Sequence, residues 1–544
     1  MAKNEKIILT AIVSLSGIIL FFACFLHDIP LRDNAHRYAP MAEAFAAGDW
    51  QFALHPRVPP LHVITSGIFA FFTGLDGFCA TKLSSVFWYF AGMFVLYRLV
   101  RLLFPEDRRI ALWSTAMYAV FPYTIQMASY GLRESAKTFF LLLCALSLVR
   151  IKRAPSDILN YLLAGMACGL GTLIRVDTVL VSLAVLASAA FIESSSRKVP
   201  WMSMLAGLLQ LAICLPSAAF NSIMFNTAVP DWKFAGVFRK FAGRMPEMPD
   251  FLIISFAAGI LLIAAAWAAE KFCRKISVKY LFVFAAVLLA ASSVRSVINC
   301  KGEYKQILSF CNSVYEGIYT FVGIFILIMV IIMWKKKKIS TYENIVLAVW
   351  FLNAFLNIIS IQLFENKLYV SSRYLHPAMA LLFCFFVRAV YGIYLQLKEH
   401  RGEKKSKIIL CSTMSLLAAA MVFHIFQPII RDYTKKKNIQ QRKKITALTE
   451  MIKKDYRPAD KKLHIRKDPS FYHTNRSPRL YFSDFNKISV AAYLAGGTLT
   501  MNIADADYII SSDESFVKKV KTHLSPVGRV NGYKRVFHVW RCEK

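Results

Sequence analysis

The chain has 544 residues, of which 56% are hydrophobic, and its mean hydropathy is +0.45. These values exclude an ordinary soluble domain, and apolar runs near the ~20 residues needed to cross a bilayer recur along the sequence. In a soluble protein, the net charge of +33 would indicate nucleic-acid binding. Here the basic residues gather in short loops between the apolar runs and in the tail, as the positive-inside rule predicts. We therefore expect a polytopic membrane protein in the lipid bilayer, with no nucleic-acid partner.

The first apolar run, Ile7 to Leu26, follows a short basic segment and predicts a membrane span with the amino terminus in the cytoplasm. Residues 27–82 then form a large first outer loop. This loop contains the polar stretch His27 to Tyr38 and a turn at Gly48-Asp49-Trp50. It also contains the short apolar run Leu61 to Phe72, which favours an interfacial or re-entrant helix over a full span.

The polar stretch continues into a predicted amphipathic helix. Tyr38, Met41, Ala42 and Phe45 recur at the i, i+3, i+4, i+7 spacing of one helical face. We expect this helix to lie on the membrane surface with that face in lipid. Asp33 stands where the helix would begin. It is therefore either a helix N-cap or a carboxylate that serves an active site at the outer surface.

With the first span, the sequence predicts about thirteen transmembrane helices. The others are Leu83–Phe104, Ile110–Met127, Ser135–Leu148, Ile158–Leu173, Val176–Ile192, Trp201–Phe220, Phe251–Ala269, Tyr280–Val297, Ile318–Trp334, Ile345–Phe364, Tyr374–Leu397 and Ile408–Phe426. Alternation from a cytoplasmic start places most Lys- and Arg-rich loops inside and leaves the tail outside. The predicted fold class is therefore an all-α polytopic membrane protein, residues 1–428, followed by a small C-terminal extracytoplasmic α/β domain, residues 429–544.

The elements predicted in the tail are a helix over Ile439–Ile452, strands at Lys462–Ile465 and Tyr508–Ser511, and a helix over Ser515–Leu524. The tail sequence contains no nucleophile motif, metal-ligand cluster or phosphate-binding loop. Two interpretations of its basic character stay open. The charges form a solvated surface, or they hold the domain against anionic lipid or an anionic acceptor.

Polar and ionisable residues gather at the span ends that this topology places outside. They are Asp33, Arg57, Arg133, Glu134, Arg175, Asp177, Arg373, Tyr374 and His376. Charged side chains near the hydrocarbon are costly, so they usually line a cavity or pair with one another. Carboxylates and several guanidinium groups at one membrane face suit a site that binds a phosphate and moves a proton.

Each of these residues also has a purely structural interpretation. Glu134 would pair with Arg133 or cap the span that follows it. The other arginines would anchor their helices at the membrane interface. His376 would pack or form hydrogen bonds rather than bind a metal, because no ligand spacing links it to another histidine. Singly, none of these residues identifies a site, so their gathering at one face carries the prediction.

Four stretches of the sequence resemble the polyprenyl-phosphate-sugar-dependent GT-C glycosyltransferases, which include the protein O-mannosyltransferases and the lipid A aminoarabinose transferases. These stretches are Asp33 to Tyr38 with the Gly-Asp-Trp turn, Pro59-Pro60-Leu61, Gly131-Leu132-Arg133-Glu134 with Gly169 to Arg175, and Arg373-Tyr374-Leu375-His376-Pro377. Two positions depart from the family. Asn34 stands where many members carry Glu, and Val58 stands where the lipid transferases carry Lys, with Arg57 one residue earlier.

The resemblance implies transfer of a sugar from a polyprenyl-phosphate donor to an extracytoplasmic lipid, glycan or protein acceptor, with inversion at the anomeric carbon. Asp33 would act as general base on the acceptor hydroxyl or orient it, and Glu134 would orient acceptor or sugar. The residues implied to bind the lipid phosphate or the substrate are Arg57, Arg133, Arg175, Arg373, Tyr374 and His376. No metal or cofactor is expected, and a bacterial inner membrane with the active site outside fits this chemistry.

Two other functions stay open. A transporter or flippase of lipid-linked sugars would show internal repeats and charges near the middle of its spans. The sequence has no evident repeat and few mid-span charges. A non-catalytic membrane scaffold would leave the gathering of Asp33, Glu134 and Arg373 at one face without a role.

Overall fold

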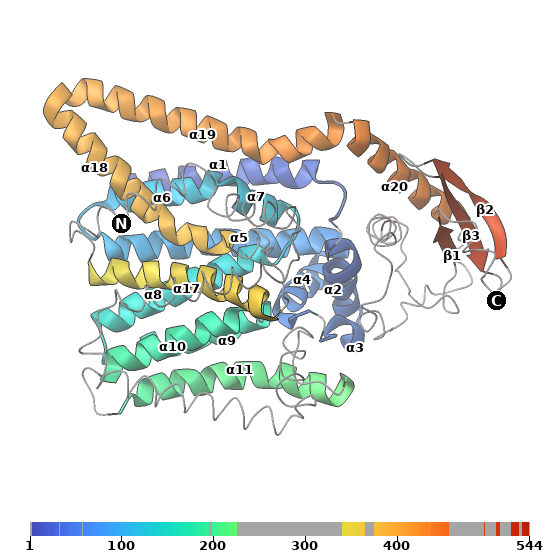
Figure 1. Ribbon diagram of the computed structural model, residues 1–544, viewed down its shortest axis with the longest axis horizontal. Coiled ribbons are helices and arrows are strands. Elements are labelled where there is room, and N and C mark those ends of the chain that lie inside the picture. Colours follow the sequence, from blue (N-terminus) through green and yellow to red (C-terminus); the bar gives the residue numbers. More distant parts are fainter. Residues whose placement is uncertain are drawn as a thin grey trace.

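The structure is a computed structural model. It describes residues 3–31, 33–56, 58–175, 177–194, 199–225, 340–364, 375–434, 436–455, 494, 508–511, 524–531 and 536–542. Most of these residues form long helices that run side by side in a bundle, with the described tail elements beyond one end of it (Figure 1).

The bundle helices are α1 (Lys3–Leu26), α5 (Gly77–Leu103), α6 (Arg108–Val120), α7 (Pro122–Ser129), α8 (Glu134–Arg153), α9 (Ile158–Ile174), α10 (Thr178–Ser194), α11 (Trp201–Phe225), α17 (Thr341–Phe364), α18 (Phe383–Arg401) and α19 (Glu403–Thr434). A short 3₁₀ helix, η3 (His376–Leu382), leads into α18. α8 lies in the interior, where it packs against α5, α9, α10 and α17. Its charged first turn is therefore held by helices on several sides.

Four helical segments of the described residues are long and apolar enough to cross a membrane: Asn4–Leu26, Gly77–Leu103, Trp201–Phe225 and His376–His400. On α1, Phe21 and Phe25 expose 67% and 73% of their surface. Side chains of this kind on a helix that is apolar all round are stable only against lipid. The protein is thus a multi-pass membrane protein.

With one exception, helices cover the predicted spans that fall on described residues, and the predicted ends differ from the helix ends by up to eight residues. The span predicted over Ile110–Met127 is wrong, because α6 ends at Val120 and a separate helix, α7, begins at Pro122. Phe121 between them is extended, with φ −71° and ψ 118°. A proline disfavours the helical conformation of the residue before it, which explains the break. The spans predicted between residues 251 and 334 lie outside the described residues.

Four short helices, η1 (Asn34–Tyr38), α2 (Ala39–Ala46), α3 (Trp50–Ala53) and α4 (Pro60–Thr73), gather at one end of the bundle. We refer to this as the α2–α4 end. α4 has 14 residues, too few to cross a bilayer, as its short apolar run predicted. The residues Tyr38, Met41 and Ala42 are only 1%, 4% and 0% exposed. The prediction that their face lies in lipid is therefore wrong.

Close packing of α2 against α4 and α5 explains this burial. A Cβ atom added to Gly67 of α4 would lie 2.4 Å from the Phe45 ring, so only glycine allows the two helices to approach this closely. The hydrophobic spacing identified the apolar face of α2 correctly. It could not distinguish lipid from the apolar side chains of neighbouring helices.

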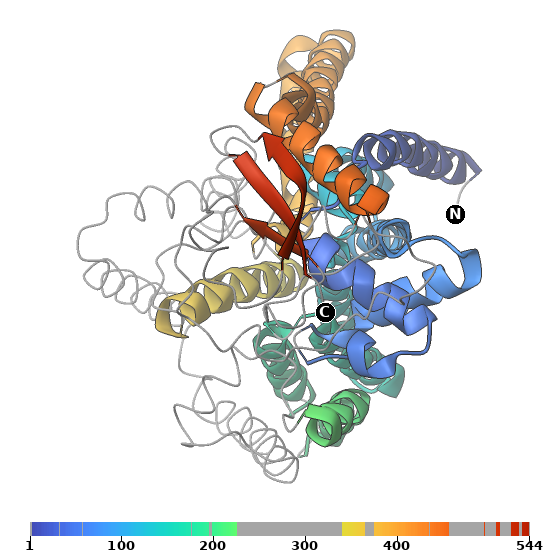
Figure 2. The same ribbon diagram turned by 90° about the vertical axis from the view of Figure 1, so that its right-hand side faces the viewer.

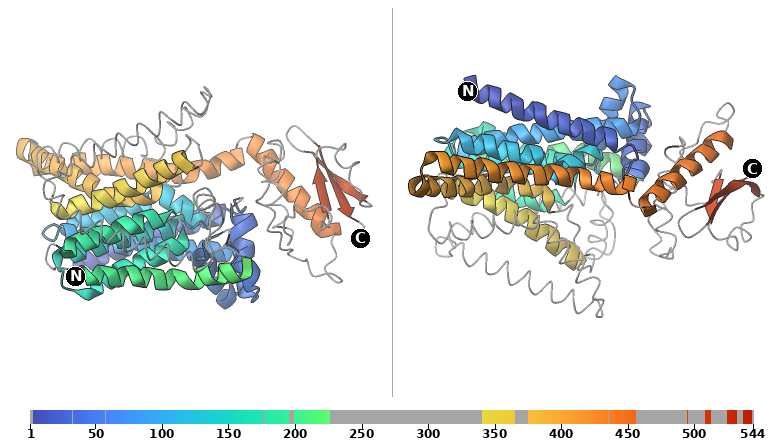
Figure 3. Two further views of the ribbon diagram at one scale, coloured as in Figure 1. Left: turned by 60° about the horizontal axis from the view of Figure 1, so that its bottom comes forward. Right: turned by 90° about the horizontal axis from the view of Figure 1, so that it is seen from above.

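The tail contains α20 (Lys436–Asp455) and three strands, β1 (Tyr508–Ser511), β2 (Leu524–Asn531) and β3 (Val536–Cys542). The strands form an antiparallel sheet in the order β1-β3-β2, and α20 packs against β2. Figures 2 and 3 show the sheet beside α20, beyond the α2–α4 end. The predicted helix over Ile439–Ile452 and the strand Tyr508–Ser511 match α20 and β1. Leu524, predicted to end a helix, begins β2.

Candidate functional site

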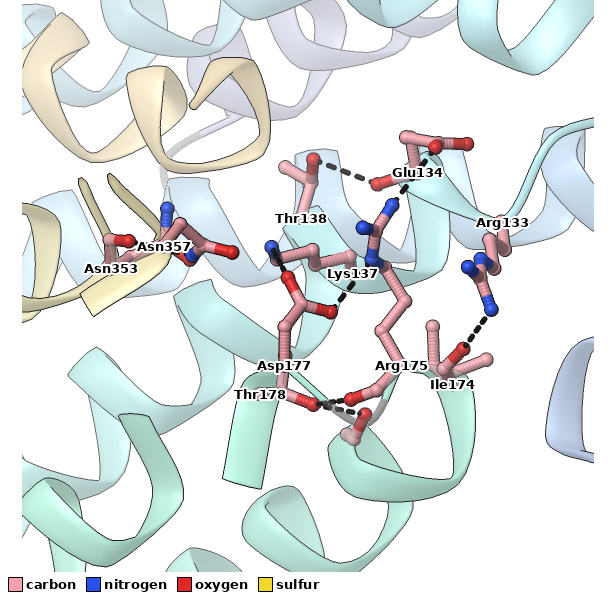
Figure 4. A network of polar contacts seen from close by, with 11 residues as sticks. Arg133, Glu134, Lys137, Thr138, Ile174, Arg175, Asp177, Thr178, Asn353 and Asn357 are labelled. Atoms are coloured by element: carbon pink, nitrogen blue, oxygen red, sulfur yellow. Dashed lines mark hydrogen bonds and ion pairs between the residues drawn. The ribbon is translucent and has the colours of Figure 1, made fainter. Parts of the chain in front are cut away.

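A buried network of charged side chains occupies the first turn of α8 (Figure 4). Nη1 of Arg175, at the end of α9, donates to Glu134 Oε1 at 3.1 Å. Nε of the same guanidinium donates to Asp177 Oδ1 at 2.8 Å. Glu134 is 1% exposed and Arg175 4%. Glu134 thus forms an ion pair with Arg175, at the end of the next helix. The structure does not show the alternative interpretation, in which Glu134 pairs with Arg133.

Lys137 completes the network. Its Nζ donates to Asp177 Oδ2 at 2.6 Å, and its side chain is fully buried. Two carboxylates thus face two cations, so the four side chains balance in charge, which a buried group of ions requires. Lys137 was missed in the sequence analysis. The sequence did indicate a role for Lys137, because this charged residue follows Glu134 at i+3, on the same helical face, within an apolar run.

The loop carboxylate Asp177 shows how strongly the network favours ionisation. Burial raises the pKa of its carboxyl, but the opposite charges of Arg175 and Lys137 outweigh burial, and the net pKa lies well below the ordinary value. Asp177 is therefore ionised at neutral pH. Its charge in turn holds the Arg175 guanidinium, which reaches Glu134 from the other side.

The turn before α8 is built on Gly131. Its φ is +68°, a left-handed conformation that glycine adopts without strain. A Cβ there would lie 2.6 Å from Thr81 Oγ1 and 2.7 Å from Asn34 Nδ2. The Gly131 carbonyl accepts from His62 Nε2 at 3.3 Å. Burial lowers the pKa of His62 to about 4, only partly offset by that hydrogen bond, so His62 is neutral at physiological pH.

Asn34 connects this turn to the segment that carries Asp33. Its Nδ2 donates to Thr81 Oγ1 at 2.8 Å and to the Tyr130 carbonyl at 2.9 Å, and it approaches the Gly131 carbonyl at 3.5 Å. Asn34 is fully buried. The departure from the family at this position therefore has a structural role, because an ionised carboxylate could not donate to backbone carbonyls.

Asp33 lies at the start of η1, a five-residue π-helix. Its side chain makes no N-cap hydrogen bond to that helix, so the capping interpretation is not supported. The residue is partly exposed, in contrast to Asn34 beside it. Short π-helical segments often occur at functional sites, because they turn a side chain away from the regular helical position.

Arg133 stands between the two segments. Its guanidinium lies over the Tyr38 ring at 5.8 Å, and Nη1 approaches the Ile174 carbonyl at 3.5 Å. Nε of Arg133 has no hydrogen-bond partner among the residues that the structure describes. Nε of Arg133 is buried, whereas Arg175 directs two of its nitrogen atoms to carboxylates.

The remaining predicted residues are placed only in part. His376 is 5% exposed and packs its ring on Tyr123 of α7, with centroids 3.9 Å apart. Its packing interpretation therefore has a structural basis. Arg57, Arg373 and Tyr374 lie outside the described residues. Chemically, the α2–α4 end offers a partly exposed carboxylate at Asp33, on a segment that Asn34 joins to the turn before the charged network of α8.

Comparison with known proteins agrees with this fold. Residues 57–220 match the family model described as dolichyl-phosphate-mannose-protein mannosyltransferase. No curated protein sequence matches the chain. Among solved structures, the apo oligosaccharyltransferase of Archaeoglobus fulgidus is similar, with a TM-score of 0.51 and 13% identity over 88% of this chain. The chain spans 64% of the length of that protein.

A second solved structure covers more of both chains. ArnT from Cupriavidus metallidurans bound to undecaprenyl phosphate has a TM-score of 0.45 and 12% identity, covering 99% of this chain and 98% of its own. The matched segment, residues 57–220, includes Arg133, Glu134 and Arg175, and Asp33 precedes this segment. Residues 57–220 are therefore similar to this mannosyltransferase family, and the fold of the chain is similar to that of the archaeal oligosaccharyltransferase.

Proposed function

We propose that this protein is a membrane glycosyltransferase that moves a sugar from a polyprenyl-phosphate donor to an extracytoplasmic lipid, glycan or protein acceptor. One observation carries the proposal. The segment of Asp33 and the buried network of Glu134 meet at the Gly131 turn, although about a hundred residues separate them in the sequence. The match to a family whose name specifies a dolichyl-phosphate sugar supports a donor of this class.

In the proposed reaction, the acceptor hydroxyl oxygen attacks the anomeric carbon from the face opposite the phosphate. The new glycosidic bond forms as the bond between carbon and phosphate oxygen breaks, so the configuration inverts. The hydroxyl proton passes to the Asp33 carboxylate, and polyprenyl phosphate leaves with the bonding electrons. The partial exposure of Asp33 is compatible with contact to an acceptor.

The other residues have proposed roles that follow from their contacts. Glu134 orients acceptor or sugar, with its carboxylate fixed by Arg175. Arg133 stabilises the leaving phosphate through the positive charge of its guanidinium. Arg57, Arg373, Tyr374 and His376 remain candidates for the donor-binding surface. Lys137 and Asp177 keep Arg175 in position and are not proposed to touch substrate.

We further propose that the site end of the bundle and the tail face the extracytoplasmic side of a plasma membrane, with residues 429–544 forming a separate small α/β domain. The Lys- and Arg-rich connection between α18 and α19, around residues 398–407, would then lie in the cytoplasm. In Figure 1 that connection lies at the opposite end of the bundle from α2–α4, which supports this orientation.

The test is release of polyprenyl phosphate from a panel of polyprenyl-phosphate sugars in proteoliposomes with a crude acceptor extract. We expect wild type to release it and the rate of Asp33→Asn to fall at least about a hundredfold, the lower end of the range for a general base. Asp76→Asn is the matched control. It makes the same chemical change at an exposed helix N-cap, where Asn caps as well as Asp.

Equal release by wild type and Asp33→Asn would remove Asp33 from the proposed chemistry. The alternative function, a transporter or flippase of lipid-linked sugars, makes a different prediction. It requires movement of the intact donor between leaflets without release of polyprenyl phosphate. A leaflet-translocation assay on the same proteoliposomes distinguishes the two.

A further inference from the structure

Helix α20 of the tail contacts the segment that carries Asp33. Nη2 of Arg442 donates to both carboxylate oxygens of Asp28, at 2.8 and 2.6 Å. The two residues are 414 positions apart in the sequence. Asp28 follows the end of α1 by two residues and precedes Asp33 by five. The tail is thus joined to the first loop five residues before the proposed general base.

An apolar cluster lies next to this ion pair. It joins Ala35 of η1 to Ile445 and Leu448 of α20 and to Val530 of β2, all less than 9% exposed. Ile29, which precedes Asp33 in the sequence, packs against the same cluster. Asp33 is therefore flanked in sequence by two residues that both pack on the tail.

The two kinds of contact contribute differently. Arg442 and Asp28 are 23% and 51% exposed, so their ion pair contributes little stability by itself and serves mainly to fix the position of α20. Burial of Leu448 and its neighbours supplies the larger part, because apolar area removed from water stabilises in proportion. Loss of either contact loosens the same segment.

The other side of η1 and the base of α20 are both attached to the membrane bundle. Asn34 holds η1 to the Gly131 turn through its amide. α20 begins almost directly after α19, whose His424 carbonyl accepts from Gln126 Nε2 of α7 at 3.0 Å. The segment of Asp33 thus contacts two structures that are each fixed to the bundle, the Gly131 turn and α20. Figures 1 and 2 show α20 following α19 at the end of the bundle where α2 lies.

We propose that α20 acts as a brace that positions Asp33 for catalysis, with Arg442, Ile445 and Leu448 as positioning residues. The catalytic part of this inference rests on the proposed function, whereas the docking itself does not. The brace gives the tail a role in the transfer reaction, although it supplies no group that touches substrate. Small displacements of a catalytic group lower the rate steeply. Contacts that hold the Asp33 segment in place would therefore raise the rate of transfer.

The experiment compares full-length Arg442→Glu and Leu448→Ala with wild type. Arg442→Glu places a carboxylate against Asp28, and Leu448→Ala removes the fully buried side chain of the cluster. Lys443→Glu is the matched control, since it makes the same charge reversal on an exposed position of α20. Rescue is tested by Asp28→Lys combined with Arg442→Glu, which restores an ion pair of opposite polarity.

Hydrogen exchange of the peptide spanning residues 27–38 measures the docking without any substrate. We expect faster exchange in Arg442→Glu and Leu448→Ala, wild-type exchange in Lys443→Glu, and partial recovery in the charge-swapped double variant. Unchanged exchange in the first two variants would overturn the proposed brace. This outcome is independent of whether the protein transfers sugar.

Steady-state kinetics measures the catalytic consequence. We expect kcat to fall about tenfold or more in the two brace variants, with KM for the donor within twofold of wild type. Faster exchange with unchanged kcat would overturn positioning and leave docking only. Absence of transfer in wild type itself would count against the proposed function, and the exchange measurement would still decide whether α20 holds this segment.

Discussion

Replacing Asn34 by Asp would place a carboxylate next to Asp33, at the position where many members of the family that the sequence resembles carry Glu. In this chain the change removes a donor and leaves the shape of the side chain nearly unchanged. The Asn34 amide donates to the Tyr130 carbonyl at 2.9 Å and approaches the Gly131 carbonyl at 3.5 Å. A carboxylate would direct an oxygen at both carbonyl oxygens.

The magnitude follows from burial and hydrogen bonding. Asn34 is fully buried, so the new charge could not be hydrated. Thr81 Oγ1 lies 2.8 Å away and could donate to one oxygen, but the Tyr130 carbonyl would lose its donor. Losing one buried hydrogen bond and adding a poorly compensated charge costs about 2–4 kcal/mol. Protonation would restore a donor, so the loss should be smaller at pH 5 than at pH 8.

The assay is thermal unfolding of the detergent-solubilised protein at both pH values. Asn344→Asp is the matched control, because it makes the same substitution on an exposed position of α17. We expect a lower unfolding midpoint for Asn34→Asp, with the larger decrease at pH 8, and little change for the control. An unchanged midpoint at pH 8 would refute the assignment of Asn34 as an obligatory donor.

Three further outcomes are expected from the same region, each measured by unfolding in detergent. Gly131→Ala should destabilise by at least about 1 kcal/mol, the cost of left-handed backbone alone, before its contact with Thr81 is counted; wild-type stability would contradict the turn geometry. Lys137→Met should cost about 3 kcal/mol, because it removes one partner of a buried ion pair, and adding Asp177→Asn should recover part of it. His62 has a pKa of about 4 against an ordinary 6.5. The unfolded chain therefore binds a proton at a pH where the folded chain does not, and stability present above pH 6.5 should fall by about 3 kcal/mol toward pH 4. His62→Gln should lack that part of the pH dependence.

Much of the membrane bundle could be predicted from hydropathy, because an apolar run of sufficient length has few alternatives to a helix in lipid. α9 begins at Ile158 and α17 ends at Phe364, as the sequence indicated. The break at Pro122 was missed, since apolar residues continue across it and the length alone fits one span. The proline was the available signal.

The candidate site was predicted as a gathering of residues at one face, and its contacts could not be. Which carboxylate pairs with Arg175 depends on how α8 and α9 pack, and sequence spacing carries no information on that packing. Asn34 appeared only as a departure from a motif, because its three acceptors come from residues 81, 130 and 131. The burial of Tyr38 and Met41 was missed for a related reason, since lipid and protein interior are both apolar.

The long sequence separations at the α2–α4 end also determine when it can assemble. The Gly131 carbonyl follows Asn34 by 97 residues, and at 5–20 residues per second the ribosome needs roughly 5–20 s to deliver it. Arg442 follows Asp28 by 414 residues, which takes roughly 20–80 s. During this interval the polar segment after α1 has already been inserted, while the groups that satisfy it have not been made. The contacts of Asn34 can therefore form early in synthesis, whereas the contacts of the first loop with α20 form only after Arg442 has been made.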